Sequence, residues 1–312
     1  MRMRKIVKFA ARYVSDADYR FCFHNQFGIY RKMPDDEFLS KLFYHRMGKK
    51  LNLNTPTSFN EKLQWLKLYD RNPIYTTMVD KHLVKQYVSD IVGEEYITPT
   101  IGVWERAEDI DFCKLPPKYV LKCNHNSGLG MYICKDNRTL SKKTIKKVRA
   151  GLEKGLKQDY YLTLREWPYR DVPRKILAEE YLEVSGDDLP DYKFHCFNGK
   201  VRLILVCCDR FSRGGMTEDF FDENWNHLDV HRPNMKFSSR ELKAPENLGK
   251  MIELAEKLSK DIPFVRVDFY DVDGKIRFGE LTFFPASGLG QFIPEEWDRI
   301  LGSYLRLPGK QL

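Results

Sequence analysis

The sequence lacks any apolar run long enough to cross a membrane as a helix. Its longest such run, from Leu203 to Cys208, is far short of the roughly 20 residues that a spanning helix needs. The first 14 residues are basic but have neither the apolar core nor the small-residue cleavage site of a signal peptide. We therefore expect a cytoplasmic protein. A peripheral contact of residues 1–14 with the inner face of the membrane stays open beside the favoured interpretation, a solvated basic helix.

Cysteine is present in an odd number and without paired spacing. None of the seven cysteines forms a C-x-x-C motif, and Cys207 and Cys208 are adjacent. This pattern argues against a disulfide framework and against a zinc site, and it is typical of a reducing compartment.

Nucleic-acid motifs are also missing, although the chain is basic. Its 52 Lys and Arg outnumber 44 Asp and Glu, which gives a formal net charge of +8. The basic residues are spread along the chain and mixed with acids, and the densest run, 142–149, fits one helix face. We therefore expect no nucleic-acid partner, and a phosphorylated or acidic substrate instead.

Residues 1–95 are predicted to be helical, and residues 96–312 to be mixed. Ser58 and Glu61 form a capping box at the start of a helix that stops near Asn72-Pro73. A second helix is predicted over 75–91, and it would carry Lys81.

The mixed region is predicted to fold as antiparallel hairpins with interspersed helices, an α+β class. Turns are expected at Asn198-Gly199 and at 271–274. Helices are expected over 140–158 and 245–260. Strands are expected over 119–122, 131–134, 175–182, 192–197, 201–208, 264–270 and 275–281.

The last predicted hairpin carries the strongest chemical pattern. Strand alternation puts Arg266 and Asp268 on one face, and Glu280 and Thr282 on one face of the partner strand. A tight turn would aim Asp268 and Glu280 into the same space. Two carboxylates there would repel each other unless a cation such as Mg²⁺ lay between them. The alternative, a surface hairpin with unrelated acids, stays open.

Two weaker patterns precede that hairpin. A predicted strand ending in Lys122 runs into a glycine-containing loop, 124–130, whose amides could hold phosphate oxygens. The loop matches neither a Walker nor a Rossmann motif, and an ordinary hairpin turn is the alternative. The segment 176–182 could offer backbone groups to a purine edge, or be a core strand.

The order of these features resembles the ATP-grasp superfamily. More narrowly, several phrases look like the TupA-like ATP-grasp family, associated with teichuronopeptide and capsular polysaccharide synthesis. The resemblance covers roughly residues 35–295. The phrases are TPTSFNEKLQWLKLYDRNP, VDKHLVKQYV, LPPKYVLKCNHNSG, DYKFHCFNGK and FVRVDFYDVDGKIRFGELTF.

The resemblance implies an ATP-grasp fold of two subdomains that clasp ATP, roughly 117–180 and 181–295, after a helical N-terminal region. It implies ATP and Mg²⁺ as cofactors. Phosphate and nucleotide contacts would come from Lys81, Lys122, Ser127, Gly128, Gly130, Glu179, Glu180, Tyr181, Leu182 and Asp191. Metal ligands would be Asp268, Glu280 and Thr282. Catalytic roles would fall to Arg266, which stabilises an acyl phosphate, and to Lys193.

Two departures from the superfamily pattern are visible. Thr282 stands where an Asn usually follows the ligand Glu, so the second metal would be held differently. The usual N-terminal Rossmann-like domain is replaced by a helical region, so the acceptor site cannot be inferred by analogy. His125 and His195 are open candidates for proton transfer, with a structural role favoured for both.

The function implied is ligation of a carboxylate to an amine through an acyl phosphate. The substrates implied are a uronic acid of a sugar nucleotide or surface polysaccharide, and an amino acid or amine. The nearest alternative among enzymes is an ATP-dependent kinase or ligase for another small carboxylate. A glycosyltransferase is a second alternative: Asp271-Val272-Asp273 superficially matches its D-x-D metal motif, but the turn that presents Asp268 and Glu280 explains this sequence better. A non-catalytic polysaccharide-binding protein is the third.

Overall fold

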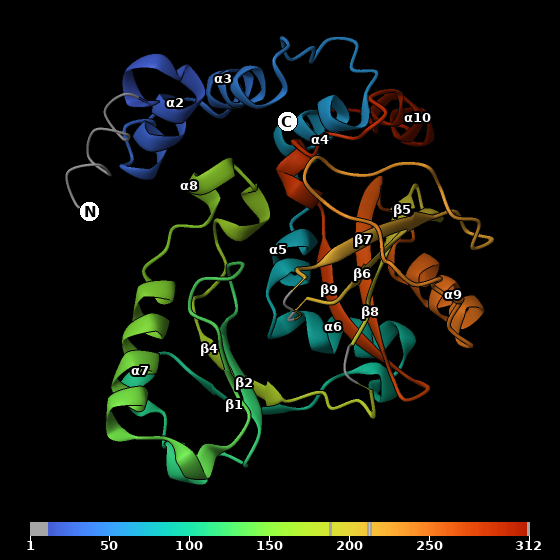
Figure 1. Ribbon diagram of the computed structural model, residues 1–312. Coiled ribbons are helices and arrows are strands. Elements are labelled where there is room, and N and C mark those ends of the chain that lie inside the picture. The colour runs from blue at the N-terminus through green and yellow to red at the C-terminus, as the bar shows by residue number, and fades with distance from the viewer. Residues whose placement is uncertain (1–11, 187–188, 211, 213, 311–312) are drawn as a thin grey trace.

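The computed structural model describes residues 12–186, 189–210, 212 and 214–310 (Figure 1). The described part of the first 95 residues is helical, as predicted. Helix α4 begins at the predicted capping box: the Ser58 hydroxyl accepts from the Glu61 amide, and the Glu61 carboxylate accepts from the Ser58 amide. The helices are α2 (Ala17–Gln26), α3 (Asp35–Met47), α4 (Phe59–Tyr69), α5 (Ile74–Val79) and α6 (Leu83–Val92).

A four-stranded antiparallel sheet forms the first lobe, in the order β1-β4-β2-β3. Its strands are β1 (Thr100–Trp104), β2 (Tyr119–Cys123), β3 (Tyr132–Cys134) and β4 (Ile176–Glu180). Helix α7 (Lys142–Leu156) lies beside this sheet, and the short α8 (Tyr161–Leu164) follows it (Figure 1). The predictions of β2, β3, β4 and α7 are confirmed, whereas β1 was not predicted.

A five-stranded antiparallel sheet forms the second lobe, in the order β7-β6-β5-β8-β9. The predicted hairpin turns are confirmed: Asn198-Gly199 and Asp273-Gly274 both have positive φ angles. The strands are β5 (Asp191–Phe197), β6 (Lys200–Cys208), β7 (Thr217–Phe221), β8 (Phe264–Val272) and β9 (Lys275–Thr282). Helix α9 (Leu248–Leu258), also predicted, covers one face, and α10 (Glu296–Tyr304) packs on α4 (Figure 1).

Each sheet has its own hydrophobic core. The core of the first lobe joins β2 and β4 to α7. The core of the second lobe also contains apolar residues of α4, α5 and α6, from Phe59 to Val88. Buried side chains on both sides of residue 95 therefore share one core, and the predicted domain boundaries stay predictions.

The prediction of one helix over 75–91 is wrong, because the chain breaks between α5 and α6. The Asp80 carboxylate accepts hydrogen bonds from the amides of His82 (2.8 Å) and Leu83 (3.3 Å), and from the Asn124 side chain (2.9 Å). A carboxylate that captures backbone amides in this way competes with helix continuation. Lys81 consequently lies in a turn between two helices and not on a helix.

No helix among the described residues is long and apolar enough to cross a membrane. Residues 1–11 of the predicted basic helix lie outside the described residues, so that helix and its membrane contact stay predictions. All seven cysteines lie within the described residues and are free thiols.

Candidate active site

Arg266 gathers the acidic groups of β8 and β9 around its guanidinium. Its Nε and Nη2 each lie 2.6 Å from an oxygen of Asp268, and Nη2 lies 2.9 Å from Glu280 Oε1. The Thr282 hydroxyl accepts from Nη2 at 3.0 Å and donates to Glu280 at 3.0 Å. The structure thus brings together the four residues that strand alternation predicted to converge, with an arginine between the two carboxylates.

A β-bulge brings Asp268 and Glu280 to the same place. Val267 pairs with Leu281 and Phe269 with Phe278, so Asp268 alone faces two residues, Gly279 and Glu280. A bulge of this kind redirects a side chain and often adjoins a functional site. A side chain at position 279 would begin 3.1 Å from the Asp268 carbonyl oxygen, so its neighbours would have to shift by a few tenths of an ångström to accept one.

Lys193 on β5 extends the cluster to a third strand. Its ammonium lies 2.5 Å from both Asp268 and Asp191, and Arg210 lies 2.7 Å from the same Asp191 oxygen. Burial would raise the pKa of the Asp268 carboxyl, but the charges of Arg266 and Lys193 outweigh it and lower that pKa. Burial and the neighbouring Asp268 charge raise the pKa of Asp191. Its Oδ1 is buried without a hydrogen-bond partner, so it has capacity for a ligand.

The first lobe contributes a second charged cluster around Glu179. Lys122 forms an ion pair with one Glu179 oxygen, and Lys85 lies 2.8 Å from the other. Burial opposes ionisation of this carboxyl, but the two lysines overcome it and lower the pKa of Glu179. Lys85 also donates to the Thr98 carbonyl (2.7 Å) and the Thr100 hydroxyl (2.8 Å), which fixes its position.

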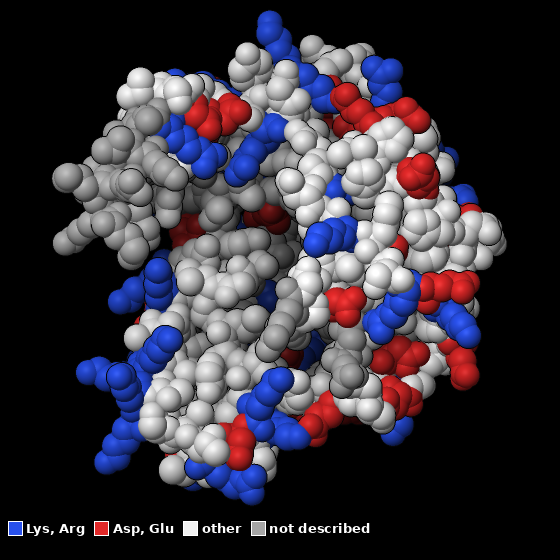
Figure 2. Space-filling model, viewed as in Figure 1, with Lys and Arg blue, Asp and Glu red and all other residues white. Residues whose placement is uncertain are grey.

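Lys81 connects the two clusters. Burial lowers the pKa of its ammonium, whereas the charge of Glu280 from the second sheet and that of Glu179 from the first raise it, and Lys122 lowers it further. Charges of both lobes are therefore within electrostatic range of this one side chain. The molecule is hollowed between the lobes, and basic and acidic atoms lie deep in the hollow (Figure 2).

The predicted glycine loop is tied to Lys81 at its base and free at its tip. The Lys81 amide donates to the Asn124 carbonyl (3.1 Å) and its ammonium to the Asn126 carbonyl. Ser127 and Gly128 are exposed. Gly130 packs on α7, where a Cβ would lie 3.1 Å from the Gly155 Cα.

The remaining predicted nucleotide contacts lie at the end of β4 and directly after it. The Glu180 amide donates to the Pro99 carbonyl at 3.2 Å, and its side chain is exposed. Tyr181 and Leu182 come directly after the strand and are half-buried. The nucleotide roles assigned to these residues and to the glycine loop stay predictions.

The donor set of the second cluster fits magnesium in its chemistry. Asp268, Glu280 and Thr282 offer only oxygen atoms, and Glu280 is 43% exposed. Within the described part of the chain, no three His, Cys, Asp or Glu residues converge as a metal site. Mg²⁺ commonly takes one or two carboxylates and completes its shell with water and phosphate. The guanidinium of Arg266 supplies the positive charge between the two carboxylates here.

His125 and His195 are both buried and held by main-chain carbonyls. The His125 ring lies 3.1 Å from the Gln158 carbonyl, and the His195 ring 3.2 Å from that of Lys193. Burial lowers the pKa of both, so the neutral form is favoured. Two neutral, buried histidines that are held by main-chain carbonyls agree with the structural role favoured for both.

The D-x-D sequence shapes the β8–β9 turn. The Asp271 carboxylate accepts from the Gly274 amide at 2.7 Å, and Asp273 accepts from the amide and hydroxyl of Ser185. Both acids are engaged in holding the turn and an adjacent loop, which agrees with the turn interpretation of this motif.

Sequence reasoning missed several groups around the site. Lys85 follows Lys81 by four residues within the helix predicted over 75–91, and that spacing was the available signal, although only Lys85 is on a helix in the structure. Arg210, Glu166 and Lys67 gave no such signal, because tertiary packing alone brings them near.

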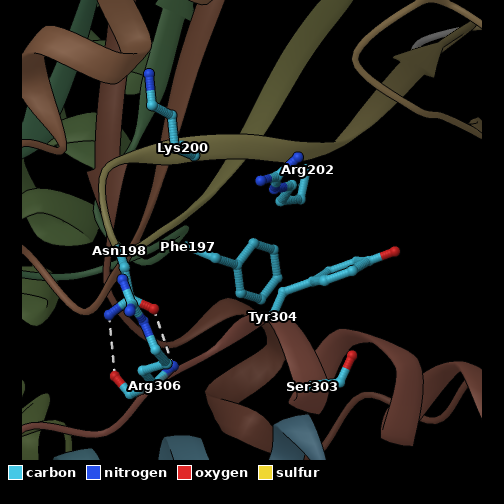
Figure 3. Close-up of a pocket in the computed structure, with 7 residues that line it drawn as sticks. All are labelled: Phe197, Asn198, Lys200, Arg202, Ser303, Tyr304 and Arg306. Atoms are coloured by element: carbon cyan, nitrogen blue, oxygen red, sulfur yellow. Dashed lines mark hydrogen bonds between the residues drawn. The ribbon is translucent and has the colours of Figure 1, made fainter.

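A separate pocket of about 470 Å³ lies at the β5–β6 turn and α10, away from these clusters. Two hydrogen bonds join the Asn198 amide to the main chain of Arg306 at its rim (Figure 3). Lys200 and Arg202 on its wall pair with Glu256 and Glu223. None of the predicted site residues lines it.

The sequence matches a known family of proteins. The two antiparallel sheets with their facing charged clusters belong to an ATP-grasp protein: the family described as TupA-like ATPgrasp matches residues 61–306. Because the match spans most of the chain, the protein is a member of the TupA-like ATP-grasp family. The predicted α+β ATP-grasp fold is confirmed.

Similar solved structures are more distant. The ligase PsnB, complexed with a minimal precursor, Mg and ADP, is 12% identical with a TM-score of 0.39, over 72% of this chain and 57% of its own. D-alanine–D-alanine ligase from Bacillus anthracis, complexed with ATP, is 17% identical with a TM-score of 0.42, over 73% of this chain and 63% of its own. N5-carboxyaminoimidazole synthetase from Staphylococcus aureus, complexed with ADP, is 11% identical with a TM-score of 0.36, over 74% and 52%. This chain thus spans less than two thirds of each. No curated protein matches the sequence.

Proposed function

We propose that the protein is an ATP-dependent carboxylate–amine ligase that forms an amide through an acyl phosphate. The single observation that carries this proposal is the arrangement of opposite charges around Lys81. Lys85 and Lys122 pair with Glu179 on the first lobe, and Arg266 pairs with Asp268 and Glu280 on the second. The charges of Glu179 and Glu280 both act on Lys81, which lies between these clusters. Membership of the TupA-like ATP-grasp family supports the same function.

In this proposal Lys81 and Lys122 hold the phosphates of ATP, and residues 179–182 lie along the base. Asp191 would accept hydrogen bonds from the ribose hydroxyls. Lys122 would have to exchange part of its pairing with Glu179 for phosphate oxygens, while Lys85 continues to neutralise that carboxylate. The exposed Ser127 and Gly128 would close over the phosphates and exclude water.

Asp268 and Glu280, with Thr282, would hold Mg²⁺. When bound, this ion supplies positive charge to phosphate oxygens during phosphoryl transfer. Arg266 would then turn part of its hydrogen bonding from these carboxylates toward the substrate.

Arg266 and Lys193 would stabilise the charge that develops on the reacting carboxylate and phosphate. The terminal phosphoryl group moves to a carboxylate oxygen, which makes that oxygen a good leaving group. The amine nitrogen then forms the C–N bond as the C–O bond to phosphate breaks, and ADP, phosphate and a proton are released. This sequence needs no covalent enzyme nucleophile, which agrees with the buried, free thiols of most cysteines.

The finer proposal is that the carboxylate is a uronic acid of a sugar nucleotide or of a surface polysaccharide, and that the amine is an amino acid or other primary amine. This substrate class is what the resemblance to a family associated with teichuronopeptide and capsular polysaccharide synthesis implies, and the net charge of +8 agrees with an acidic substrate. A cytoplasmic location is proposed with it, because ATP is abundant there and the free thiols suit a reducing compartment.

Calorimetry with ATP and Mg²⁺ tests the nucleotide site on the wild type and on Glu280→Gln. Asp219→Asn serves as the matched control, since Asp219 is a buried carboxylate on β7 that holds Ser238 and His227. We expect the wild type and the control to bind alike, and Glu280→Gln to bind at least tenfold more weakly. Binding of UDP-sugars without any binding of ATP would overturn the ligase proposal in favour of a glycosyltransferase.

The reaction itself is tested by phosphate release with a panel of UDP-glucuronate, UDP-galacturonate, tri-galacturonate and amino acids. Hydroxylamine is added as a general acceptor, because it converts an acyl phosphate to a hydroxamate. Hydroxamate formation that requires both ATP and one acid of the panel is the expected result. ATP binding without hydroxamate from any acid would contradict the proposed reaction.

A further inference from the structure

The cavity at the β5–β6 turn and the end of α10 has a defined shape. Its volume of about 470 Å³ is within the range of about 300–1,000 Å³ that is usual for small-ligand pockets. The Asn198 side chain joins its two walls, because it donates to the Arg306 carbonyl at 2.9 Å and accepts from the Arg306 amide at 2.8 Å (Figure 3). The cavity begins at Phe197, four residues along β5 from Lys193, or roughly 13 Å at about 3.3 Å per residue. It is therefore separate from the candidate active site.

The charged residues that line this cavity are all cations, namely Lys200, Arg202 and Arg306. Lys200 pairs with Glu256 at 2.6 Å, and its ammonium is turned away from the aromatic rings of the cavity (Figure 3). Arg202 donates one hydrogen bond at 3.0 Å to Glu223, and its side chain is 46% exposed. A guanidinium has five N–H donors, and an exposed ion pair contributes little to stability. Arg202 can therefore donate further hydrogen bonds to a ligand.

Arg306 differs from the other two cations because it has no acidic partner. Over the described ranges of the chain, no Asp or Glu lies within ion-pair distance of its guanidinium. The residue is exposed, and its main chain is held by the two hydrogen bonds to Asn198. Its side chain can therefore bind an anion without breaking an ion pair.

The rings of Phe197 and Tyr304 form the apolar part of the cavity. They meet edge to face, with centroids 5.8 Å apart. Phe197 is buried, whereas Tyr304 is 39% exposed, so part of its ring is available to a ligand. Arg202 lies across from the two rings (Figure 3). A ligand in the cavity would thus meet a guanidinium on one side and an aromatic surface on the other.

An aromatic surface beside two guanidinium groups suits a sugar that carries one carboxylate. The forked N–H groups of arginine match the two oxygens of a carboxylate, and an aromatic ring can pack on the C–H face of a sugar ring. Two of the three cations already pair with glutamates, so the cavity has a surplus of one positive charge, that of Arg306. A single carboxylate neutralises this surplus. A phosphate dianion would exceed it, and a neutral sugar would leave it without a counter-charge.

We propose that this cavity binds a carboxylate-bearing sugar unit of an acidic polysaccharide. This inference follows from the lining of the cavity, and only its use in the reaction rests on the proposed ligase function. A sugar unit bound here is too far along β5 to occupy the active site as well, so the ligand is a chain with several acidic units. Binding of one unit would keep the others at a high effective concentration near Lys193 and Arg266.

Calorimetry with polygalacturonate, in the absence of nucleotide, tests the cavity on the double variant Arg202→Gln/Arg306→Gln. We expect the wild type to bind polygalacturonate but not dextran, which is neutral, and the double variant to bind at least tenfold more weakly. Lys250→Met/Lys257→Met is the matched control, because it removes two exposed cations that pair with Glu253 on α9, outside the cavity. It should bind like the wild type. Equal losses in both double variants would indicate non-specific attraction to a polyanion, and would overturn the inference.

Tyr304→Leu tests the aromatic surface without changing the charge. It should bind polygalacturonate several-fold more weakly than the wild type, at a similar melting temperature. Inorganic phosphate that displaces polygalacturonate more strongly than chloride does at the same ionic strength would overturn the assignment of a carboxylate ligand.

The hydroxamate assay measures the use of the cavity in the reaction. Arg202→Gln/Arg306→Gln should raise KM for polygalacturonate at least fivefold and leave KM for UDP-galacturonate, which has a single acidic sugar, and the affinity for ATP unchanged. A wild type that binds no polygalacturonate, or a double variant that binds it undiminished, would overturn this inference and leave the ligase function standing. A wild type that binds polygalacturonate but forms no hydroxamate from any acid would overturn the ligase function and leave the ligand of the cavity standing.

Discussion

The guanidinium of Arg266 forms a two-bond ion pair with Asp268, with Nε and Nη2 each 2.6 Å from a carboxylate oxygen. The same Nη2 also donates to Glu280, so one arginine forms ion pairs with both of the carboxylates proposed as metal ligands. Arg266 and a divalent cation should therefore compete for the same two carboxylates.

The competition predicts how Arg266→Ala responds to Mg²⁺. The substitution leaves the buried Asp268 with Lys193 alone, and removing one partner of a buried pair costs roughly 3 kcal/mol. Added Mg²⁺ should restore part of that stability and raise the melting temperature of the variant more than that of the wild type. Arg202→Ala, which breaks an exposed ion pair with Glu223, should melt close to the wild type with or without Mg²⁺. Equal Mg²⁺ shifts in all three proteins would contradict the prediction.

Gly279→Ala should distort the bulge that joins the two carboxylates. The new Cβ would lie 3.1 Å from the Asp268 carbonyl oxygen and 3.1 Å from the Tyr270 ring. We expect a loss of about 1–3 kcal/mol in the free energy of unfolding, as for other overpacked sites. The affinity for ATP with Mg²⁺ should fall at the same time.

Gly151→Ala is the matched control for that substitution. Gly151 lies in α7, and nothing would lie within 4 Å of the added Cβ. Helix propensity predicts a gain of about 0.5–1 kcal/mol, with ATP affinity unchanged. Urea unfolding and calorimetry measure both variants, and a neutral Gly279→Ala would show that the bulge tolerates a side chain.

Lys85→Met should weaken ATP binding, although Lys85 itself is not proposed to contact the nucleotide. Lys85 neutralises Glu179 from the side opposite Lys122, so its loss would draw Lys122 more firmly to that carboxylate. We expect the Kd for ATP to rise about three- to tenfold and the Mg²⁺ dependence of binding to stay the same. Lys118→Met removes a pair with Glu183 at the surface, and it should leave the Kd unchanged.

Lys67 gives a prediction for the pH dependence of stability. Burial lowers its pKa from 10.5 to about 8, although Glu166 and Asp35 oppose the shift. Between these two values the unfolded chain binds a proton that the folded chain does not, so this residue makes the wild type more stable as pH rises.

Lys67→Met lacks this contribution. Its deficit in the free energy of unfolding relative to the wild type should therefore grow between pH 7 and pH 10, by an amount on the order of 1–3 kcal/mol. Urea unfolding at the two pH values measures it. A deficit that shrinks at alkaline pH would mean that the folded protein keeps Lys67 charged.

Local sequence was sufficient to predict those structural features that depend only on residues close together in the chain. The capping box at Ser58, the glycine turns after Asn198 and Asp273, and the alternation that aligns Arg266 with Asp268 follow from short-range geometry. Local sequence failed at 75–91, because the Asp80 carboxylate captures amides and is itself held by Asn124, 44 residues later.

The sequence by itself determined the α+β class, the main hairpins and the residues that carry the proposed nucleotide and metal chemistry. Only the tertiary structure decided which of these residues meet. The bulge at Gly279, the ammonium of Lys193 between two aspartates, and the position of Lys81 between the lobes depend on contacts between strands and helices far apart in the chain.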